Sequence, residues 1–287
     1  MGAPAAARGR LLVVGTPIGN LGDLTPRAAE ALRTADLVVA EDTRLAQRLL
    51  AHLGVRRPTS AFNEHNADER LPALLARLEA GQTLALTTDA GMPGVSDPGA
   101  RLVAAARAAG AQVEVLPGPS AVTAAMALSG EEATGFVFGG FLPARPAASR
   151  AAALQRLLGA AGAAGLPLIL FEAPHRVSGL LRDLERHLAA HPQLRVVATR
   201  ELTKIHEQVL VGRPAEVGAA LAAPRGEFTL VVFGLSAPPA AGDAELRAAP
   251  VLAAARQAGL SDRTTVELLR AVGVERRAAY RLIHDKP

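Results

Sequence analysis

Four short segments of the sequence mix acids, bases and amides, the groups used for proton transfer or phosphate binding. We place each segment at the end of a strand, and an apolar run that predicts this strand precedes all of them except residues 63–66. The four segments span residues 40–44 (AEDTR), 63–66 (NEHN), 172–176 (EAPHR) and 200–207 (RELTKIHE). Taken singly, each also fits a helix cap with solvated charges, so no single segment establishes a site.

Three other segments are rich in glycine, which lets a ligand or another backbone approach closely. Asp89 ends a predicted strand, and its carboxylate could accept hydrogen bonds from a ribose or an amine, whereas Asp97 fits a helix N-cap. Ser120 fits either an N-cap or the wall of a pocket for a planar ligand. Ligands bind at the carboxyl ends of strands in open α/β sheets, so the three segments together predict a shared pocket. These segments are residues 15–23 (GTPIGNLGD), 87–99 (TTDAGMPGVSDPG) and 116–121 (LPGPSA).

Several familiar kinds of site are missing from the sequence. The glycine-rich segments match neither the dinucleotide-binding motif nor the P-loop, and no G-x-S-x-G nucleophile motif occurs. There is no cysteine. The only histidines four residues apart on a predicted helix are His187 and His191, in a surface-like turn, so we expect no metal site.

The charge balance is only mildly basic. The formal net charge is +4, and 29 of the 31 cationic residues are arginine, which suits phosphate and base contacts but also fits a genome-wide compositional bias. No apolar run approaches the roughly 20 residues needed to span a bilayer, and the first residues lack the apolar core of a signal peptide. The sequence therefore predicts a soluble, cytoplasmic protein.

Short Val- and Leu-rich runs alternate with helical patterns along the chain and predict an α/β fold with two domains. An N-terminal α/β domain with a mostly parallel sheet is expected over residues 10–118. A C-terminal α/β domain is expected over 119–235, with a partly antiparallel sheet because its later strands are closely spaced. We predict a linker over 236–250 and a small helical segment over 251–287.

Local signals set the expected helix ends. Thr25 followed by proline predicts the start of one helix, and Asn66 opens a capping-box pattern for another. Gly259 and Gly273 are expected to separate the helices of the last segment.

With these segments placed, the chain resembles the tetrapyrrole methylase superfamily, the class III S-adenosylmethionine-dependent methyltransferases. The resemblance covers about residues 10–235, and residues 273–282 (GVERRAAYRL) resemble the small C-terminal helical piece of the family. Tetrapyrrole-modifying members typically carry Gly-Asp-Pro where this chain has Asp89-Ala90-Gly91, a difference that favours the RNA-modifying branch. The segments that carry the resemblance, in chain order, are VGTPIGNLGD (14–23), AEDTR (40–44), FNEHN (62–66), DAGMPGVSDPG (89–99), LPGPSA (116–121), FEAPHR (171–176) and RELTKIHE (200–207).

The resemblance implies a homodimer whose subunits bind S-adenosylmethionine in a cleft between the two α/β domains. It also implies 2′-O-methylation of a cytidine ribose in the decoding region of 16S rRNA. The cofactor contacts that it implies are Pro17, Ile18, Thr88, Asp89, Gly91, Met92, Ser120, Ala121, Glu172 and Leu202.

Methyl transfer from a sulfonium is an in-line displacement, so much of the catalysis can be positioning. A ribose hydroxyl is a weak acid, so a base, or a cation that stabilises the developing alkoxide, should also help. Two alternatives remain open: a methyltransferase of the same fold that acts on a small tetrapyrrole, and a non-catalytic RNA-binding factor. We expect the base or cation among Glu41, Asp42, Glu64, His65, Glu201 and Lys204, and phosphate or base contacts from Arg44, Arg176 and Arg200.

Overall fold

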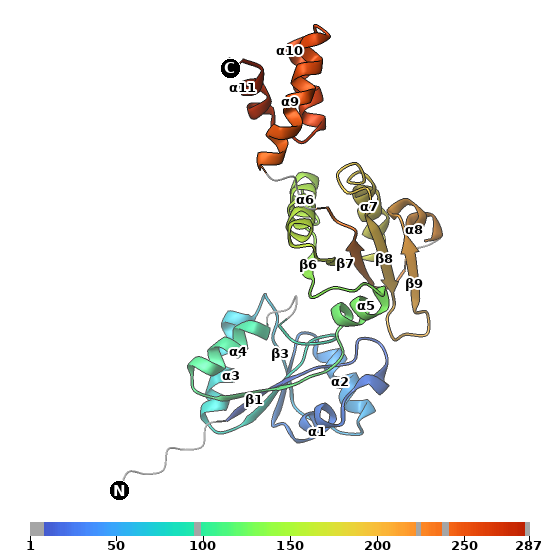
Figure 1. The fold of residues 1–287 in the computed structure, drawn as a ribbon. Helices are drawn as coiled ribbons and strands as arrows, with labels where there is room; N and C mark the ends of the chain where they lie inside the picture. Colours follow the sequence, from blue (N-terminus) through green and yellow to red (C-terminus); the bar gives the residue numbers. More distant parts are fainter. Residues whose placement is uncertain (1–8, 95–98, 222–224, 237–240, 285–287) are drawn as a thin grey trace.

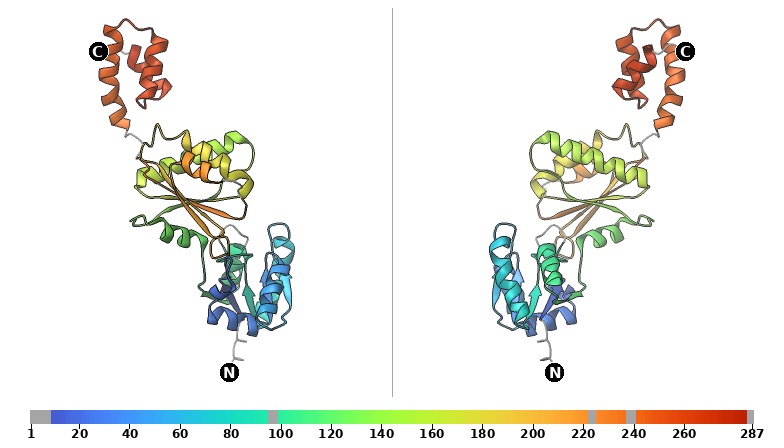
Figure 2. Two further views of the ribbon diagram at one scale, coloured as in Figure 1. Left: turned by 90° about the vertical axis from the view of Figure 1, so that its right-hand side faces the viewer. Right: turned by 90° about the vertical axis from the view of Figure 1, so that its left-hand side faces the viewer.

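The computed structural model describes residues 9–94, 99–221, 225–236 and 241–284, and these form three consecutive parts (Figure 1). Two α/β domains follow each other along the chain, and a group of three helices lies beyond the second domain. Two side views show the three parts in a row, with the first domain at one end and the three helices at the other (Figure 2).

The first domain is built on a five-stranded parallel sheet with the strand order β3-β2-β4-β1-β5. The predicted parallel sheet is therefore confirmed, although no sequence pattern indicates β3, which has three half-buried residues and no large apolar side chain. The strands are β1 (Arg10–Val14), β2 (Leu37–Ala40), β3 (Thr59–Ala61), β4 (Thr83–Leu86) and β5 (Gln112–Leu116). The helices are η1 (Leu21–Asp23, a 3-10 turn), α1 (Pro26–Thr34), α2 (Thr43–His52), α3 (Ala67–Glu79) and α4 (Gly99–Ala108).

Both faces of this first sheet are covered, which explains why its central strands are apolar at consecutive positions. In β1, Leu12 packs in one core with α1 and α2, whereas its neighbour Leu11 packs in the opposite core with α3 and α4. Both leucines are buried. The polar groups of the domain that can meet a ligand are thereby left at the strand ends.

The predicted helix starts differ in how their side chains are used. Thr25 caps α1 as predicted, because its hydroxyl accepts a hydrogen bond from the Ala28 amide. The capping-box prediction at Asn66 is wrong in its chemistry: α3 does begin after Asn66, but the Asn66 side chain accepts from the Asn63 amide and caps no helix donor. Ser120 likewise precedes α5 (Ala121–Ser129) without a side-chain cap. The predicted N-cap Asp97 lies outside the described residues.

The second domain has a mixed five-stranded sheet with the order β6-β7-β10-β8-β9. Strands β6 and β7 are parallel and the other neighbours are antiparallel, as the close spacing of the later strands predicts. The strands are β6 (Val137–Phe141), β7 (Leu168–Glu172), β8 (Arg195–Arg200), β9 (Gln208–Gly212) and β10 (Phe228–Phe233). The helices are α5 (Ala121–Ser129), α6 (Ala147–Ala164), α7 (Pro174–Glu185) and α8 (Pro214–Ala220).

Helix α5 covers the face of the second sheet that is turned toward the first domain, and α6, α7 and α8 cover the other face (Figures 1 and 2). The core beneath α5 includes Ile18, which comes from the loop after β1 of the first domain. The two domains therefore share an apolar contact around Ile18.

The C-terminal helices are α9 (Ala241–Gln257), α10 (Asp262–Ala271) and α11 (Arg276–His284), and Gly259 and Gly273 separate them with positive φ angles, as predicted. Residues 241–250 belong to α9, so this part of the expected linker is helical. None of the helices in the described ranges is long and apolar enough to cross a membrane.

Candidate active site

A cavity of about 380 Å³ lies between the two α/β domains, at the carboxyl ends of the strands of the first sheet. The loops after β1, β4 and β5 line it from the first side, and the ends of β6, β7 and β10 line it from the second. Strands β4, β1 and β5 are adjacent in the sheet, so their loops converge, as in other open α/β sheets with ligands at this edge.

The first-domain wall is held together by backbone contacts. Thr16 and Gly91 form a two-way bridge, with N···O distances of 2.9 and 3.2 Å, that ties the loop after β1 to the loop after β4. Gly91 has a φ of +82°, a conformation that favours glycine. Gly15 and Gly118 touch so closely that a Cβ on Gly15 would lie 2.7 Å from the Gly118 backbone. These glycines therefore set the spacing of three loops.

The second-domain wall is made of larger side chains. Phe141 and Phe171 line the cavity with their rings 5.4 Å apart, and Phe228 and Thr229 line it from β10. An apolar wall facing polar loop groups suits a ligand that has both a flat apolar part and polar substituents.

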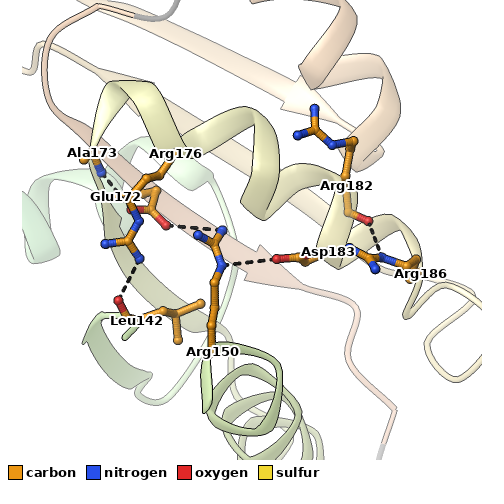
Figure 3. A network of polar contacts seen from close by, with 8 residues as sticks. All are labelled: Leu142, Arg150, Glu172, Ala173, Arg176, Arg182, Asp183 and Arg186. Carbon is orange, nitrogen blue, oxygen red and sulfur yellow. Dashed lines mark hydrogen bonds and ion pairs between the residues drawn. The ribbon is translucent and has the colours of Figure 1, made fainter. Parts of the chain in front are cut away.

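Behind this second wall lies a buried ion-pair network centred on Glu172, whose side chain is 0% exposed (Figure 3). Arg176 places its Nε 3.1 Å from Glu172 Oε1, and the amide of Ala173 donates to the same oxygen at 2.9 Å. Arg176 also donates to the carbonyl of Leu142 at 2.7 Å. The network thereby joins the ends of β6 and β7 to the first turn of α7.

Arg150 of α6 completes this network (Figure 3). Its guanidinium lies 3.6 Å from Glu172 Oε2 and 3.2 Å from Asp183 Oδ2 of α7. At 3.6 Å the contact with Glu172 is an ion pair without a hydrogen bond, and among the described residues Oε2 accepts none. Asp183 also pairs with Arg186 nearer the surface, so the network contains three arginines and two carboxylates.

A second recess, of about 420 Å³, adjoins the cavity and shares Ile18, Thr88 and Asp89 with it. It is more polar, and both Arg48 and Lys204 line it. The cavity and the recess form two adjacent compartments, one mainly apolar and one carrying cations.

Lys204 lies where the loop after β8 meets the loop after β1 of the first domain; we call this contact the seam. Its ammonium donates to Glu201 at 2.9 Å and to Glu227 at 3.0 Å. Its stem meets the first domain, because a Cβ on Gly19 would lie 2.5 Å from Lys204 Cγ. Nearby, the Thr203 hydroxyl accepts from the Asn20 amide at 3.0 Å. Both Glu201 and Thr203 have positive φ angles, so this loop is held in an unusual conformation by its contacts.

Charge pairing fixes the protonation states of this seam. Burial alone would lower the pKa of Lys204, but its hydrogen bonds to Glu201 and Glu227 outweigh burial and raise that pKa above its ordinary value. Burial would raise the pKa of Glu201, but hydrogen bonds from Lys204 and from the Glu227 amide outweigh it and lower that pKa. At neutral pH, Lys204 is therefore an ammonium and Glu201 a carboxylate.

The loop after β2 connects to the cavity through Asp89. Asp89 Oδ1 accepts a hydrogen bond from the Asp42 amide at 3.0 Å, and the Thr88 hydroxyl donates to Glu41 at 3.3 Å. Hydrogen bonds from the side chain and backbone of Arg44 lower the pKa of Asp42 to about 2. Asp42 is consequently a weak base.

Most of the cofactor contacts implied by the resemblance meet at the cavity. Pro17 lines the adjoining recess instead, and Leu202 is buried in the apolar core with Ile18. The carboxylate of Glu172 is occupied by its arginines, although the residue itself lines the cavity. The eight predicted residues that line the cavity are Ile18, Thr88, Asp89, Gly91, Met92, Ser120, Ala121 and Glu172.

The predicted catalytic and RNA-contacting residues are more scattered. Lys204 lines the recess, and Glu201 holds it, but the exposed Glu64 and His65 line neither the cavity nor the recess. The guanidinium of Arg176 is used inside the domain, which argues against the predicted RNA contact. Arg200 donates from Nε to the carbonyl of Arg225 at 2.6 Å, whereas Arg44 is largely exposed on the surface.

Sequence reasoning did not identify the aromatic wall, Arg48 or Glu227. Phe228 and Thr229 begin an apolar strand and carry no motif, so only the tertiary structure brings them to the cavity. Arg48 lies on α2, one turn beyond the AEDTR segment, and that spacing would have been a usable signal. No group of three or more potential metal ligands is found among the residues that the structure describes.

Comparison with known proteins gives matches at the level of both sequence and fold. The family described as Tetrapyrrole (Corrin/Porphyrin) Methylases matches residues 10–218. The Ribosomal RNA small subunit methyltransferase I of Xylella fastidiosa (strain Temecula1) is 47% identical over 230 residues, which cover 79% of this chain and 82% of that protein. The protein of the same name from Thermotoga maritima is 40% identical over 228 residues, covering 79% of this chain and 99% of that protein.

Two solved structures illustrate the similarity of fold. Diphthine synthase aligns with a TM-score of 0.63 at 17% identity, over 78% of this chain and 90% of the other. Uroporphyrin-III C-methyltransferase from Thermus thermophilus, solved in complex with S-adenyl homocysteine, gives a TM-score of 0.56 at 21% identity, over 78% and 97%. These identities support a shared fold and nothing finer.

Proposed function

The chain belongs to the tetrapyrrole methylase family, and we propose that it methylates the 2′-hydroxyl of a cytidine ribose in the decoding region of 16S rRNA. S-adenosylmethionine is its cofactor. The observation that carries the proposal is the 40–47% identity, over most of the chain, to proteins named as methyltransferases of small-subunit ribosomal RNA.

The cavity between the domains fits S-adenosylmethionine. Its volume of about 380 Å³ suits a small cofactor, and Gly91, which carries no side chain, lines it. Asp89 offers a carboxylate for the ribose or amine groups, and Ile18 and Met92 offer apolar contacts. When bound, the cofactor supplies a methyl group that its sulfonium has already activated.

The adjoining recess is the proposed site of the acceptor nucleotide. The ribose hydroxyl develops negative charge as it attacks, and the Lys204 ammonium can stabilise that charge from the recess wall. Glu201 and Glu227 act by holding Lys204 protonated and oriented. Asp42 and Glu201, whose pKa values are lowered, are poor candidates for the general base. Electrostatic stabilisation is therefore favoured over proton abstraction by either of them.

The proposal includes a homodimer. Exposed apolar side chains gather on the loop and edge strand that follow β8, and such patches are typical of protein interfaces. Ile205 is 97% exposed and Val211 is 63% exposed. Light scattering of the purified chain tests this part, and a monomer mass at micromolar concentration contradicts it.

The experiment for the proposed activity is transfer of labelled methyl groups from S-adenosylmethionine to small ribosomal subunits or 16S rRNA that lack the modification. Mass spectrometry of digested RNA should find 2′-O-methylcytidine in a decoding-region fragment. Label on a tetrapyrrole substrate but none on RNA would favour the small-molecule methyltransferase. If calorimetry detects no S-adenosylmethionine binding, the chain is not a methyltransferase of this kind.

A further inference from the structure

The three C-terminal helices form a unit with its own small core. Val266 and Leu269 of α10 pack against Ala248 of α9 and Ala279 of α11, and these four side chains are buried. The unit lies beyond the second domain, at the opposite end of the molecule from the first domain and thus away from the cavity (Figure 2). Its function is therefore separable from the cavity itself.

The end of the chain carries most of its excess positive charge. Residues 251–287 contain seven cationic and four anionic side chains, a net charge of +3, whereas the rest of the chain carries only +1. The positive charge is concentrated further on α11, which contains three arginines and no acidic residue.

The exposed side chains of α11 form one continuous face, since they recur at the spacing of successive helical turns. The opposite side of the helix carries the buried Ala279 and the half-buried Leu282 and Ile283. We call the exposed side the α11 face; it consists of Arg276, Arg277, Tyr280, Arg281 and His284.

Two of these arginines occupy positions where a positive charge lowers the stability of the helix. Arg276 and Arg277 occupy the first turn of α11, where the helix dipole is positive and acidic side chains are preferred. A helix N-terminus beside two guanidinium groups is well suited to a phosphate. The exposed Glu275 directly before α11 offsets one of these charges, and the cations that remain on the face point to an anionic partner.

The aromatic residue on the α11 face makes RNA the anion that fits best. Tyr280 is 41% exposed and stacks on His284, with ring centroids 6.4 Å apart and an angle of 15° between the planes. His284 in turn lies 3.6 Å from Asp262 of α10, and both side chains are exposed. Unpaired bases of RNA stack on exposed aromatic and arginine side chains, while phosphates pair with arginine. An acidic protein surface would use the arginines but would have no particular use for the flat ring pair.

We propose that the α11 face is an RNA-binding surface that holds the ribosomal RNA substrate at a distance from the methyl-transfer site. The proposal rests on the proposed function, since it takes 16S rRNA as the substrate. It predicts that the face contributes to RNA affinity and to KM for RNA, and contributes neither to cofactor binding nor to kcat.

The test compares two full-length triple variants with the unmodified protein. In the first, Arg276, Arg277 and Arg281 of the α11 face are replaced by glutamine. The control carries Arg27→Gln, Arg70→Gln and Arg107→Gln, which remove the same charge from exposed sites on α1, α3 and α4. Affinity for protein-free 16S rRNA is measured over a range of salt concentrations, together with kcat, KM for RNA and S-adenosylmethionine affinity.

We expect the first variant to bind RNA about tenfold more weakly at moderate salt, with a salt slope lower by about one for each phosphate that the arginines no longer neutralise. Its kcat at saturating RNA and its cofactor affinity should match those of the unmodified protein. Its melting temperature should stay the same or rise, because the substitutions remove two cations that the helix dipole disfavours in the first turn. The control should change RNA affinity by less than about twofold.

A second pair of variants tests the stacking contact. Tyr280→Ala should weaken RNA binding by about tenfold, whereas Tyr280→Phe, which keeps the ring, should restore most of the affinity. Equal affinity of the Ala and Phe variants overturns the stacking role.

Three outcomes overturn the inference. One is unchanged RNA affinity in the α11 triple variant, and another is an equal loss in the control. The third is a loss for intact small subunits without a loss for protein-free 16S rRNA, which would assign the face to a ribosomal protein. Failure of the proposed function would give a different result: the unmodified protein would bind S-adenosylmethionine but would methylate no ribosomal RNA.

Discussion

The two walls of the central cavity are built by different means. The first-domain wall consists of loops whose positions are set by backbone contacts, such as the Thr16–Gly91 bridge and the touching Gly15 and Gly118. The second-domain wall consists of side chains supported from behind by the buried Glu172 network. One wall depends on the absence of side chains, and the other on their charges.

This difference determines how each wall can fail. A backbone contact tolerates no added atom, because backbone cannot rotate away as a side chain can. A buried ion pair tolerates small changes in shape but not the loss of one partner, which leaves a charge buried without compensation. The following changes probe the two walls and the seam between them.

The largest effect is expected from Glu172→Gln in the second wall. The substitution keeps the shape but leaves Arg150 and Arg176 without their shared carboxylate, whose side chain is 0% exposed. Breaking such a pair should lower the free energy of unfolding by about 3–5 kcal/mol and raise the KM for S-adenosylmethionine. Urea denaturation measures the first effect.

The matched control is Glu69→Gln, which removes a surface carboxylate 3.9 Å from Arg70 and should leave the unfolding midpoint unchanged. Equal midpoints for Glu172→Gln and the unmodified protein would show that the network does not hold the second wall.

The next largest effect is expected at the seam, with Lys204→Gln. Removal of the cation should lower kcat by about 100-fold, in the range found for loss of one group that stabilises an oxyanion. S-adenosylmethionine affinity should be nearly unchanged, because Lys204 lines the recess rather than the cavity. Lys204→Arg, which keeps the charge, should retain more activity in single-turnover assays. The raised pKa of Lys204 means that its protonated form, and the rate it supports, should persist to a higher pH than for an ordinary lysine side chain.

If Lys204→Gln raises only the KM for the cofactor and leaves kcat unchanged, Lys204 acts on cofactor binding and not on the acceptor nucleotide. Lys204 would then support the second wall of the cavity, as the Glu172 network does.

The contrast between the walls also explains what can be predicted from the sequence. The first wall is predictable because its chemistry is local: glycines and a carboxylate follow directly on strands, and Thr88, Asp89 and Gly91 line the cavity together. The βαβ order of the first domain and its helix start at Thr25 are equally local signals.

Apart from Glu172, which the resemblance indicates, the second wall could not be predicted because its partners are distant in sequence. Arg150 meets Glu172 from another helix, so neither residue type nor spacing indicates that this arginine is buried. The same limit applies to the predicted RNA contact at Arg176, whose guanidinium is paired inside the domain, since a surface arginine and a buried, paired arginine look alike in the sequence. Strand β3 is not evident from the sequence because its edge position requires no apolar pattern.

A smaller effect is expected from Gly15→Ala in the first wall. The added Cβ would lie 2.7 Å from backbone atoms of Gly118 and from the sulfur of Met92, so the loops must separate. Overpacking of this kind should cost about 1–3 kcal/mol of stability and weaken S-adenosylmethionine binding, measured by calorimetry.

Gly159→Ala in α6 is the matched control, because a Cβ there meets nothing within 4 Å. Alanine is the better helix former, so this variant should be neutral or slightly more stable. If Gly15→Ala behaves as Gly159→Ala does, backbone contact does not set the spacing of the first wall.

The smallest effect is expected from Arg44→Gln, at the outer edge of the first wall. Arg44 lowers the pKa of Asp42 to about 2, from an ordinary value of 3.8, so the variant should return that pKa toward 3.8 in an NMR titration. Because the folded-state pKa of Asp42 is lowered, its pairing contributes stability above pH 3.8 and loses it as the pH falls through about 2. Both side chains are at the surface, so the stability change should be barely measurable and confined to acid.

The same variant should leave cofactor affinity at neutral pH unchanged. The Asp42 amide should still donate to Asp89, since that bond involves no side-chain charge of Asp42. A clear loss of cofactor affinity in Arg44→Gln would instead mean that this surface pair holds the loop that supports Asp89, and that the first wall also depends on charge.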